Sequence, residues 1–164
     1  MAANETKTYK PGKSIKRARA VGAGNTKWHI NVNDREYVWA TKMDRVKIIR
    51  KGLPFESLEV ISKKADLPVK QVLKFFGLPQ TTYNKKKKDQ DLLNSRDSEV
   101  VLVLAEIFAF GLEVFNQEAD KFQRWLKKPN ISLGGATPVS LFDSLTGIQE
   151  VRNSLNRLEF GNLA

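Results

Sequence analysis

The sequence predicts an all-α protein, with an N-terminal helix-turn-helix domain followed by a small C-terminal helical bundle. Three observations lead to this fold class. From about residue 41 onward, apolar residues recur at spacings of three and four, the period of a helix with one buried face. Glycines and prolines stand where such helices should begin and end. A short turn containing Gly77 separates two of the predicted helices.

The distribution of charge divides the chain into two parts. Its 164 residues carry a net charge of +10. Residues 1–90 hold 21 Lys/Arg against 8 Asp/Glu, a balance of +13, and residues 91–164 hold 7 against 10, a balance of −3. This asymmetry indicates that the first part meets a polyanion such as nucleic acid. The alternative is that the lysines serve only solubility.

Composition removes several classes of function. The chain has no cysteine and a single histidine, His29, so we expect no disulfide, no thiolate metal site and no cluster of imidazole ligands. No cofactor is predicted. No apolar stretch approaches the roughly 20 residues of a membrane span. The basic N-terminus lacks the apolar run of a secretory signal, so a cytoplasmic protein is expected. The carboxylates fall at helix-surface spacings without a partner histidine, and no enzyme is predicted; they are Asp97, Glu99, Glu106, Glu113, Glu118 and Asp120.

Residues 1–40 are predicted to be a basic N-terminal arm. Lysines and arginines interleave with glycines through residue 27, and such a stretch buries too little apolar surface to offset its ordering entropy. It is either mobile or lies on nucleic acid. Between Trp28 and Trp39, apolar residues alternate around Asn33-Asp34, which is compatible with a short hairpin.

Residues 41–95 are predicted to form the helix-turn-helix domain. A first short helix ends near Gly52, and Pro54 suits the first turn of a second. A third helix ends at Gly77, a residue suited to a left-handed C-cap. Leu78 and Pro79 make the turn, and a fourth helix runs from Gln80 to about Lys88.

The fourth helix is the candidate DNA-reading element. Gln and Asn can pair with adenine in the major groove, and Thr can meet a base edge or a thymine methyl group. Lysines bind phosphates, which makes affinity dependent on salt. The candidate DNA-binding residues are Gln80, Thr81, Thr82, Asn84, Lys85, Lys86, Lys87 and Lys88. The alternative is that Gly77 is an ordinary helix end and the four lysines form a solvated face.

Residues 96–164 are predicted to form the second domain. A helix from about Asp97 to Asn116 is apolar on more than one face, which indicates a central position or a subunit interface. A further helix carries Trp125 and ends before Pro129. Thr137-Pro138 is expected to begin another. Thr146 to Gln149 has the form of a capping box for the last helix, whose apolar stripe is Ile148, Val151, Leu155 and Leu158.

Residues 125–161 carry an ordered set of helix boundaries. They are Trp125-Leu126, Pro129-Asn130, Leu133-Gly134-Gly135, Thr137-Pro138, Gly147, Val151, and the run from Leu155 through Arg157-Leu158-Glu159 to Gly161. Each of these residues has a local structural reason. The paired glycines, for example, allow backbone angles that are unfavourable for other residues. As a whole, the pattern resembles the toxin-binding domain of the Xre/MbcA/ParS antitoxins. With the Xre-like helix-turn-helix before it, the resemblance covers roughly residues 45–164.

The resemblance implies a protein with two roles. Members of this family neutralise a RES-domain toxin, which consumes NAD or transfers ADP-ribose from it, and they repress their own operon as complexes. The implied partners are a RES-domain toxin, double-stranded operator DNA and a second copy of the chain, with the helix at 97–116 as the expected dimer contact. The expected mechanism is occlusion of the toxin's active site. The candidate toxin-binding residues are Arg152, Asn156, Arg157, Glu159, Phe160, Gly161, Asn162 and Leu163.

Two other functions remain open from the sequence. The first is a stand-alone helix-turn-helix repressor whose C-terminal half only dimerises or senses a ligand. The second is a binder of nucleic acid without sequence preference, using the basic arm and the lysine run, with a steep dependence on salt. For Arg157 and Glu159, pairing inside their own bundle is the alternative to contact with a toxin.

Overall fold

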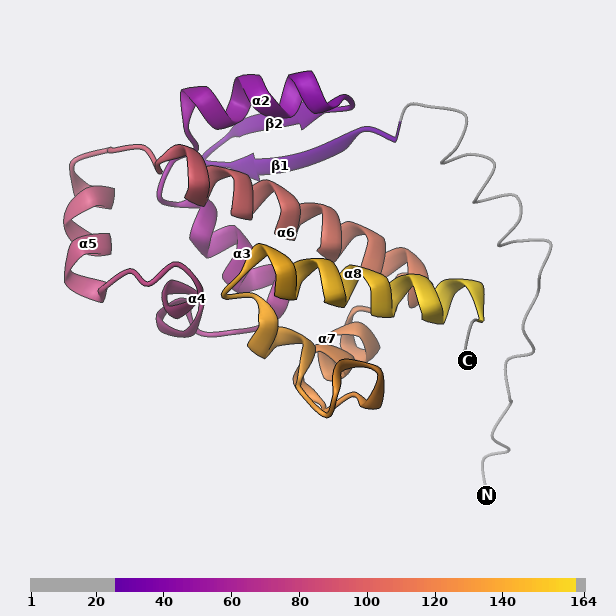
Figure 1. Ribbon diagram of the computed structural model, residues 1–164. Coiled ribbons are helices and arrows are strands. Elements are labelled where there is room, and N and C mark those ends of the chain that lie inside the picture. Colours follow the sequence, from indigo (N-terminus) through magenta and orange to yellow (C-terminus); the bar gives the residue numbers. More distant parts are fainter. Residues whose placement is uncertain (1–25, 162–164) are drawn as a thin grey trace.

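A 20-residue helix, α6 (Ser95–Val114), is the axis of the fold. The computed structural model describes residues 26–161. Around α6 pack the strand β1 (Trp28–Val32) and the helices α2 (Lys42–Lys51), α3 (Ser57–Ala65) and α8 (Leu145–Phe160), as Figure 1 shows. Ten residues of α6 are buried, and the apolar ones join one continuous core with residues from every layer.

The burial of α6 bears on both roles expected for this helix. Its apolar faces are covered by β1, α2, α3 and α8 of the same chain, so the central position is confirmed. A subunit contact through this helix stays a prediction, because several apolar residues of α6 remain partly exposed, among them Val103, Phe110 and Leu112. No helix within residues 26–161 is both long and apolar enough to cross a bilayer.

The segment before α2 is a hairpin. Strand β1 pairs antiparallel with β2 (Arg35–Trp39), with Trp28 opposite Trp39. Asn33 and Asp34 make the turn with φ of 47° and 60°, a left-handed pair typical of tight hairpins. Ile30, Val32 and Trp39 are buried in the core. The alternating residues therefore form the hairpin that the sequence allows. The predicted arm of residues 1–40 is corrected at its C-terminal end, because residues 28–39 belong to the folded core. Residues 1–25 lie outside the described part of the chain. The fold is helical with one added hairpin.

The next four helices match their predicted positions. Thr41 caps α2 through a capping box with Asp44, and Gly52 ends this helix with φ of 86°. Helix α3 follows, then α4 (Val69–Phe75) and α5 (Gln80–Lys88). The end of α4 places Gly77 in the left-handed region, with φ of 58°, as the sequence predicts.

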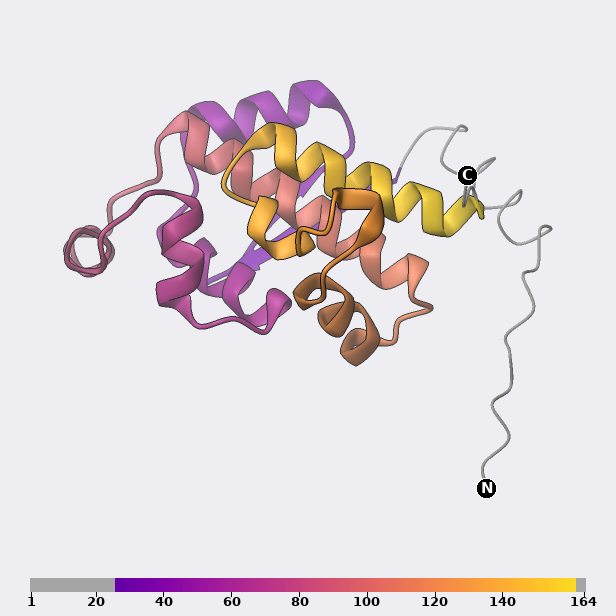
Figure 2. The ribbon, with the colours of Figure 1, turned by 60° about the horizontal axis from the view of Figure 1, so that its bottom comes forward.

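The C-terminal part is built from shorter pieces. Helix α7 (Ala119–Lys127) is followed by two 3₁₀ turns, η1 (Ile131–Leu133) and η2 (Pro138–Leu141), and then by α8. An aromatic cluster joins them to α6, with the Phe108 ring 6.1 Å from that of Phe122 and 5.9 Å from that of Phe142. Figure 2 shows these pieces gathered against the C-terminal half of α6.

Three details differ from the prediction for this part. Thr137-Pro138 begins a 3₁₀ turn rather than an α-helix, with no side-chain cap from Thr137. Ser144, not Thr146, caps α8, because its side chain accepts a hydrogen bond from the Gly147 amide. Leu158 is 41% exposed, so it does not continue the buried stripe of Ile148, Val151 and Leu155.

We predict that Gly147→Ala destabilises the protein. A Cβ at this position would overlap the backbone carbonyl of Leu141, so η2 or α8 must shift. Overpacking of this kind costs about 1–3 kcal/mol. Thermal unfolding followed by circular dichroism should show a midpoint lower by about 2–12 °C. Gln149→Ala, on the exposed face of the same turn, is the control, and equal midpoints for the two variants would contradict the prediction.

Candidate nucleic-acid and partner interfaces

Helices α4 and α5 form a helix-turn-helix. The Gly77 amide donates to the Lys74 carbonyl and the Leu78 amide to the Leu73 carbonyl, which closes the end of α4. Pro79 then precedes the first residue of α5. The turn makes α5 stand at one edge of the molecule (Figure 1). A second helix presented in this way can enter a major groove.

Helix α5 is fixed to α3 by one carboxylate. The buried Tyr83 donates from its hydroxyl to Glu59 at 2.8 Å, and the Lys87 ammonium forms an ion pair with the same carboxylate. The Lys87 ammonium lowers the pKa of the Glu59 carboxyl. Burial, and then the hydrogen bond to Glu59, raise the pKa of the Tyr83 hydroxyl. Tyr83 therefore has two roles: its ring packs in the core, and its hydroxyl fixes the orientation of α5 relative to α3.

The exposed face of α5 holds most of the predicted DNA-binding residues. Gln80, Thr81, Thr82 and Asn84 are all exposed, and the Gln80 amide donates to Asn84 at 3.0 Å. This internal hydrogen bond preorders the two amides that are expected to read bases.

The four lysines of α5 are not equivalent. Lys85 and Lys88 are exposed. Lys86 pairs with Asp91 at 2.8 Å, and Lys87 turns back to Glu59. Sequence reasoning did not separate these four residues. Glu59, which engages Lys87, lies 28 residues away on α3, whereas Asp91 lies only five residues after Lys86, just past the end of α5.

A buried carboxylate joins the two halves of the molecule. Glu106 of α6 is 6% exposed and accepts three charged or polar donors, which together we call the Glu106 cluster. Trp39 of β2 donates from its indole at 2.8 Å, Arg45 of α2 at 3.1 Å, and Arg152 of α8 at 2.8 Å. Placing Glu106 with surface carboxylates was wrong, because its donors lie 46 to 67 residues away in the sequence.

The predicted toxin-binding residues fall into several environments. Arg152 belongs to the Glu106 cluster, and the Arg157 guanidinium donates to the Ser132 carbonyl at 3.3 Å. Both therefore pair within their own fold. Asn156 is half-buried, and Glu159 is half-buried and engaged in an interaction of its own.

The end of α8 is more open to solvent. Phe160 is 43% exposed, and Gly161 ends the helix in the left-handed region with φ of 65°. Asn162 and Leu163 lie outside the described residues, so their predicted role stays a prediction.

The segment from Asn130 to Ala136, which we call the 130–136 loop, is docked on α8. The Ser132 hydroxyl lies 2.8 Å from that of the buried Ser154. Gly134 and Gly135 take φ of 65° and 85°, as their sequence predicts. The loop presents Ile131, which is 97% exposed.

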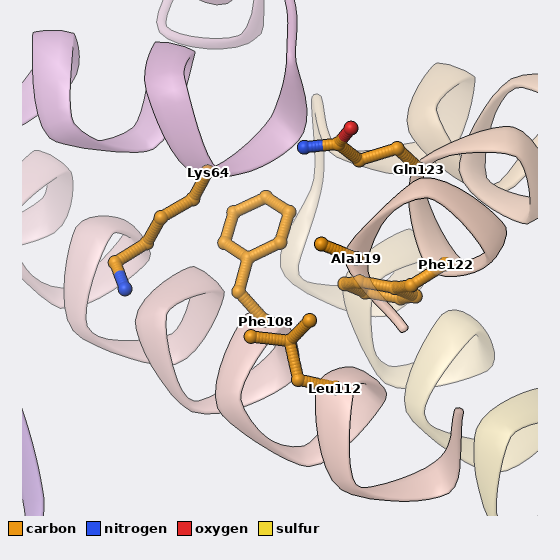
Figure 3. Close-up of a pocket in the computed structure, with 6 residues that line it drawn as sticks. All are labelled: Lys64, Phe108, Leu112, Ala119, Phe122 and Gln123. Atoms are coloured by element: carbon orange, nitrogen blue, oxygen red, sulfur yellow. The ribbon is translucent and has the colours of Figure 1, made fainter. Parts of the chain in front are cut away.

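A small cavity lies between α3, α6 and α7 (Figure 3). Its volume is about 150 Å³. The lining is mostly apolar, with Lys64 and Gln123 as the polar contributors, and includes Phe108, Leu112, Ala119 and Phe122. Within residues 26–161, histidine and carboxylate side chains form no group of three able to hold a metal ion.

Comparison with known families identifies both halves of this arrangement. Residues 44–106 match the model of the antitoxin Xre-like helix-turn-helix domain, and residues 111–161 match that of the antitoxin Xre/MbcA/ParS C-terminal toxin-binding domain. The chain belongs to the Xre/MbcA/ParS-type antitoxins.

Curated relatives agree with this assignment. A protein of Photorhabdus laumondii named antitoxin Xre is 25% identical over 114 residues, covering 70% of this chain and 77% of that protein. A protein of Sphingobium sp. (strain YBL2) named Prs ADP-ribosylating antitoxin is 29% identical over 133 residues, covering 76% and 84%. An antitoxin Xre of Yersinia enterocolitica is 24% identical over 116 residues, covering 71% and 78%.

The two matched domains meet inside α6 of this antitoxin. The first match ends at residue 106 and the second begins at residue 111, so each takes part of one continuous helix. The hairpin of residues 28–39 precedes both matches but supplies Trp39 to the Glu106 cluster.

We predict that Glu106→Gln destabilises the antitoxin. The amide keeps an acceptor but removes the negative charge shared by Arg45 and Arg152, whose side chains are 26% and 34% exposed. Breaking a fully buried ion pair costs about 3–5 kcal/mol, and partial exposure lowers this to about 2 kcal/mol. Urea unfolding measures the loss.

The control for this experiment is Glu36→Gln, which neutralises an exposed carboxylate on the hairpin. It should change the free energy of unfolding by less than about 0.5 kcal/mol. A Glu106→Gln protein as stable as this control would show that the cluster contributes no net stability.

Proposed function

We propose that this chain is the antitoxin of a type II toxin–antitoxin system, which neutralises a RES-domain toxin by occluding its active site and represses its own operon. The observation that carries the proposal is the presence of both matched domains on one core, with their candidate surfaces apart. Helix α5 and the C-terminal end of α8 stand at opposite ends of the molecule in Figures 1 and 2. DNA and toxin can therefore bind one antitoxin together.

The proposed toxin contact is the end of α8 and the residues after it. Phe160 offers an apolar side chain, and the left-handed Gly161 turns the chain away from the helix axis. The final residues would enter the toxin's cleft and exclude NAD. A relative whose name includes ADP-ribosylation supports a toxin that uses ADP-ribose chemistry.

The proposed DNA contact is a palindromic operator read by two copies of α5 in a homodimer, in the cytoplasm where the operon lies. Base edges would be met by Gln80, Thr81, Thr82 and Asn84. Lys85 and Lys88 would bind phosphates, whereas Lys86 and Lys87 are engaged by Asp91 and Glu59. Specific binding should exceed non-specific binding by about 1,000-fold or more.

The difference between the lysines gives a prediction. Lys85→Ala and Lys88→Ala should each lower the affinity for the operator. Each should also reduce the salt slope, which is the steepness with which the logarithm of affinity falls with the logarithm of salt concentration, by about one for each phosphate that a monomer no longer binds. Lys87→Ala should leave the slope closer to wild type, because its ammonium already neutralises Glu59. Fluorescence anisotropy over a range of salt concentrations measures the slopes, and equal slopes for all three variants would refute the assignment.

The occlusion mechanism is tested by deletion of residues 160–164. The truncated antitoxin should keep its fold and its dimerisation, because the core residues of α8 end at Leu155, but it should release toxin activity. NAD consumption by the co-purified RES-domain protein of the same operon is the readout. Neutralisation at wild-type stoichiometry would rule out this role for the tail.

The stand-alone repressor is the second candidate. It requires a C-terminal half that senses a ligand or only dimerises. For ligand sensing, the cavity between α3, α6 and α7 is small: its volume of about 150 Å³ is below the roughly 300 Å³ of the smallest typical ligand pockets. A neighbouring reading frame for a RES-domain protein that cannot be expressed without this chain would decide for the antitoxin.

A further inference from the structure

Ile131 is the most exposed large apolar side chain in the described part of the chain, at 97%. Such a residue adds nothing to the core. Single exposed apolar residues are common on protein surfaces and by themselves indicate no site. The loop that carries Ile131 and the residues beside it provide the argument.

The 130–136 loop is held in one shape. The Asn130 side chain accepts hydrogen bonds from both the amide and the hydroxyl of Ser132, each at 2.9 Å. Two backbone hydrogen bonds close the loop. The backbone N–H of Asn130 donates to the carbonyl of Ala136 at 3.0 Å, and the backbone N–H of Gly135 donates to the backbone carbonyl of Asn130 at 2.9 Å. The loop therefore satisfies much of its own hydrogen bonding and leaves Ile131 outside.

The loop is also tied to α8 on its inner side. Ser132 contacts the buried Ser154 through the two hydroxyls, and the Ser132 carbonyl accepts from Arg157. Leu133 packs against the core. Since isoleucine is stiff at χ1, a partner that takes up Ile131 loses little conformational entropy.

Two more apolar side chains belong to the segment joined to this loop. Leu158 and Phe160, at 41% and 43% exposure, follow Arg157 in the last turns of α8. The η1 turn of the loop contacts α8, and Figure 2 shows the loop beside this helix. Three of the exposed large apolar residues therefore come from two segments that the Arg157–Ser132 hydrogen bond holds together.

We propose that Ile131, Leu158 and Phe160 form an apolar docking surface for the toxin, with Ile131 as an anchor that enters an apolar pocket of that protein. This inference rests on the proposed function. The toxin is the occupant because all three residues lie in the segment that matches a toxin-binding domain. Phe160 is also the first residue of the segment that is proposed to enter the active site. An aliphatic anchor that fills a pocket of the partner, with a polar rim around it, is a common element of protein interfaces.

The test is Ile131→Asp in the full-length antitoxin. Biolayer interferometry against the purified RES-domain protein of the same operon should show affinity at least 30-fold weaker, mainly through faster dissociation. A 30-fold change corresponds to about 2 kcal/mol. Met43→Asp is the matched control, because Met43 is a 63% exposed apolar residue of α2 in the other domain. The control should keep wild-type toxin affinity, and both variants should keep the wild-type thermal midpoint and operator affinity.

A second variant tests the rigidity of the loop with Ile131 in place. Asn130→Ala removes the acceptor of two hydrogen bonds and should weaken toxin binding by about 3–10-fold, since the anchor must then be ordered on binding. The size of this effect should lie between those of Met43→Asp and Ile131→Asp.

Wild-type affinity of the Ile131→Asp protein for the toxin would overturn the inference and leave the proposed function intact. So would unchanged toxin affinity with an altered oligomeric state of the free antitoxin, since the surface would then be a contact between copies. Failure of the unmodified antitoxin to bind the RES-domain protein would overturn the proposed function itself.

Discussion

The charge of Glu106 is the constraint on which the architecture depends. A carboxylate at 6% exposure must be compensated, and its three donors come from a strand, a helix of the helix-turn-helix segment and the last helix of the segment that matches the toxin-binding domain. The directional hydrogen bonds of the cluster fix the register of β2, α2 and α8 against α6.

The central helix explains why two recognisable domains behave as one body. Both family matches take part of α6, and the core is continuous across it. Arg152 shows the consequence for function. It was predicted to contact the toxin, yet its guanidinium completes the Glu106 cluster while remaining 34% exposed. The two ion pairs of Glu106 thus link α8 to α2.

Local features of the fold were predictable from the sequence, and distant contacts were not. The bounds of α2, α4 and α5 follow from Thr41, Gly52 and Gly77, because capping and left-handed turns depend on neighbouring residues. The role of Glu106 depends on donors in three other elements, β2, α2 and α8. The spacing of residues along one helix does not contain this information, so it predicts an exposed carboxylate. The ion pair of Lys87 with Glu59 is hidden for the same reason. The predicted cap of α8 was wrong for another reason: Ser144 and Thr146 are both residue types that cap helices, and the helix begins at Leu145, directly after Ser144.

The hairpin sets a lower limit on the length of a viable protein. It precedes both recognised family segments, yet it contributes Ile30, Val32 and Trp39 to the interior. Proteolytic trimming past Trp39 would open one side of α6 to water and leave Glu106 with only its two arginines. Cleavage at that point would thus expose core surface of α6, although every residue of the two family segments would survive.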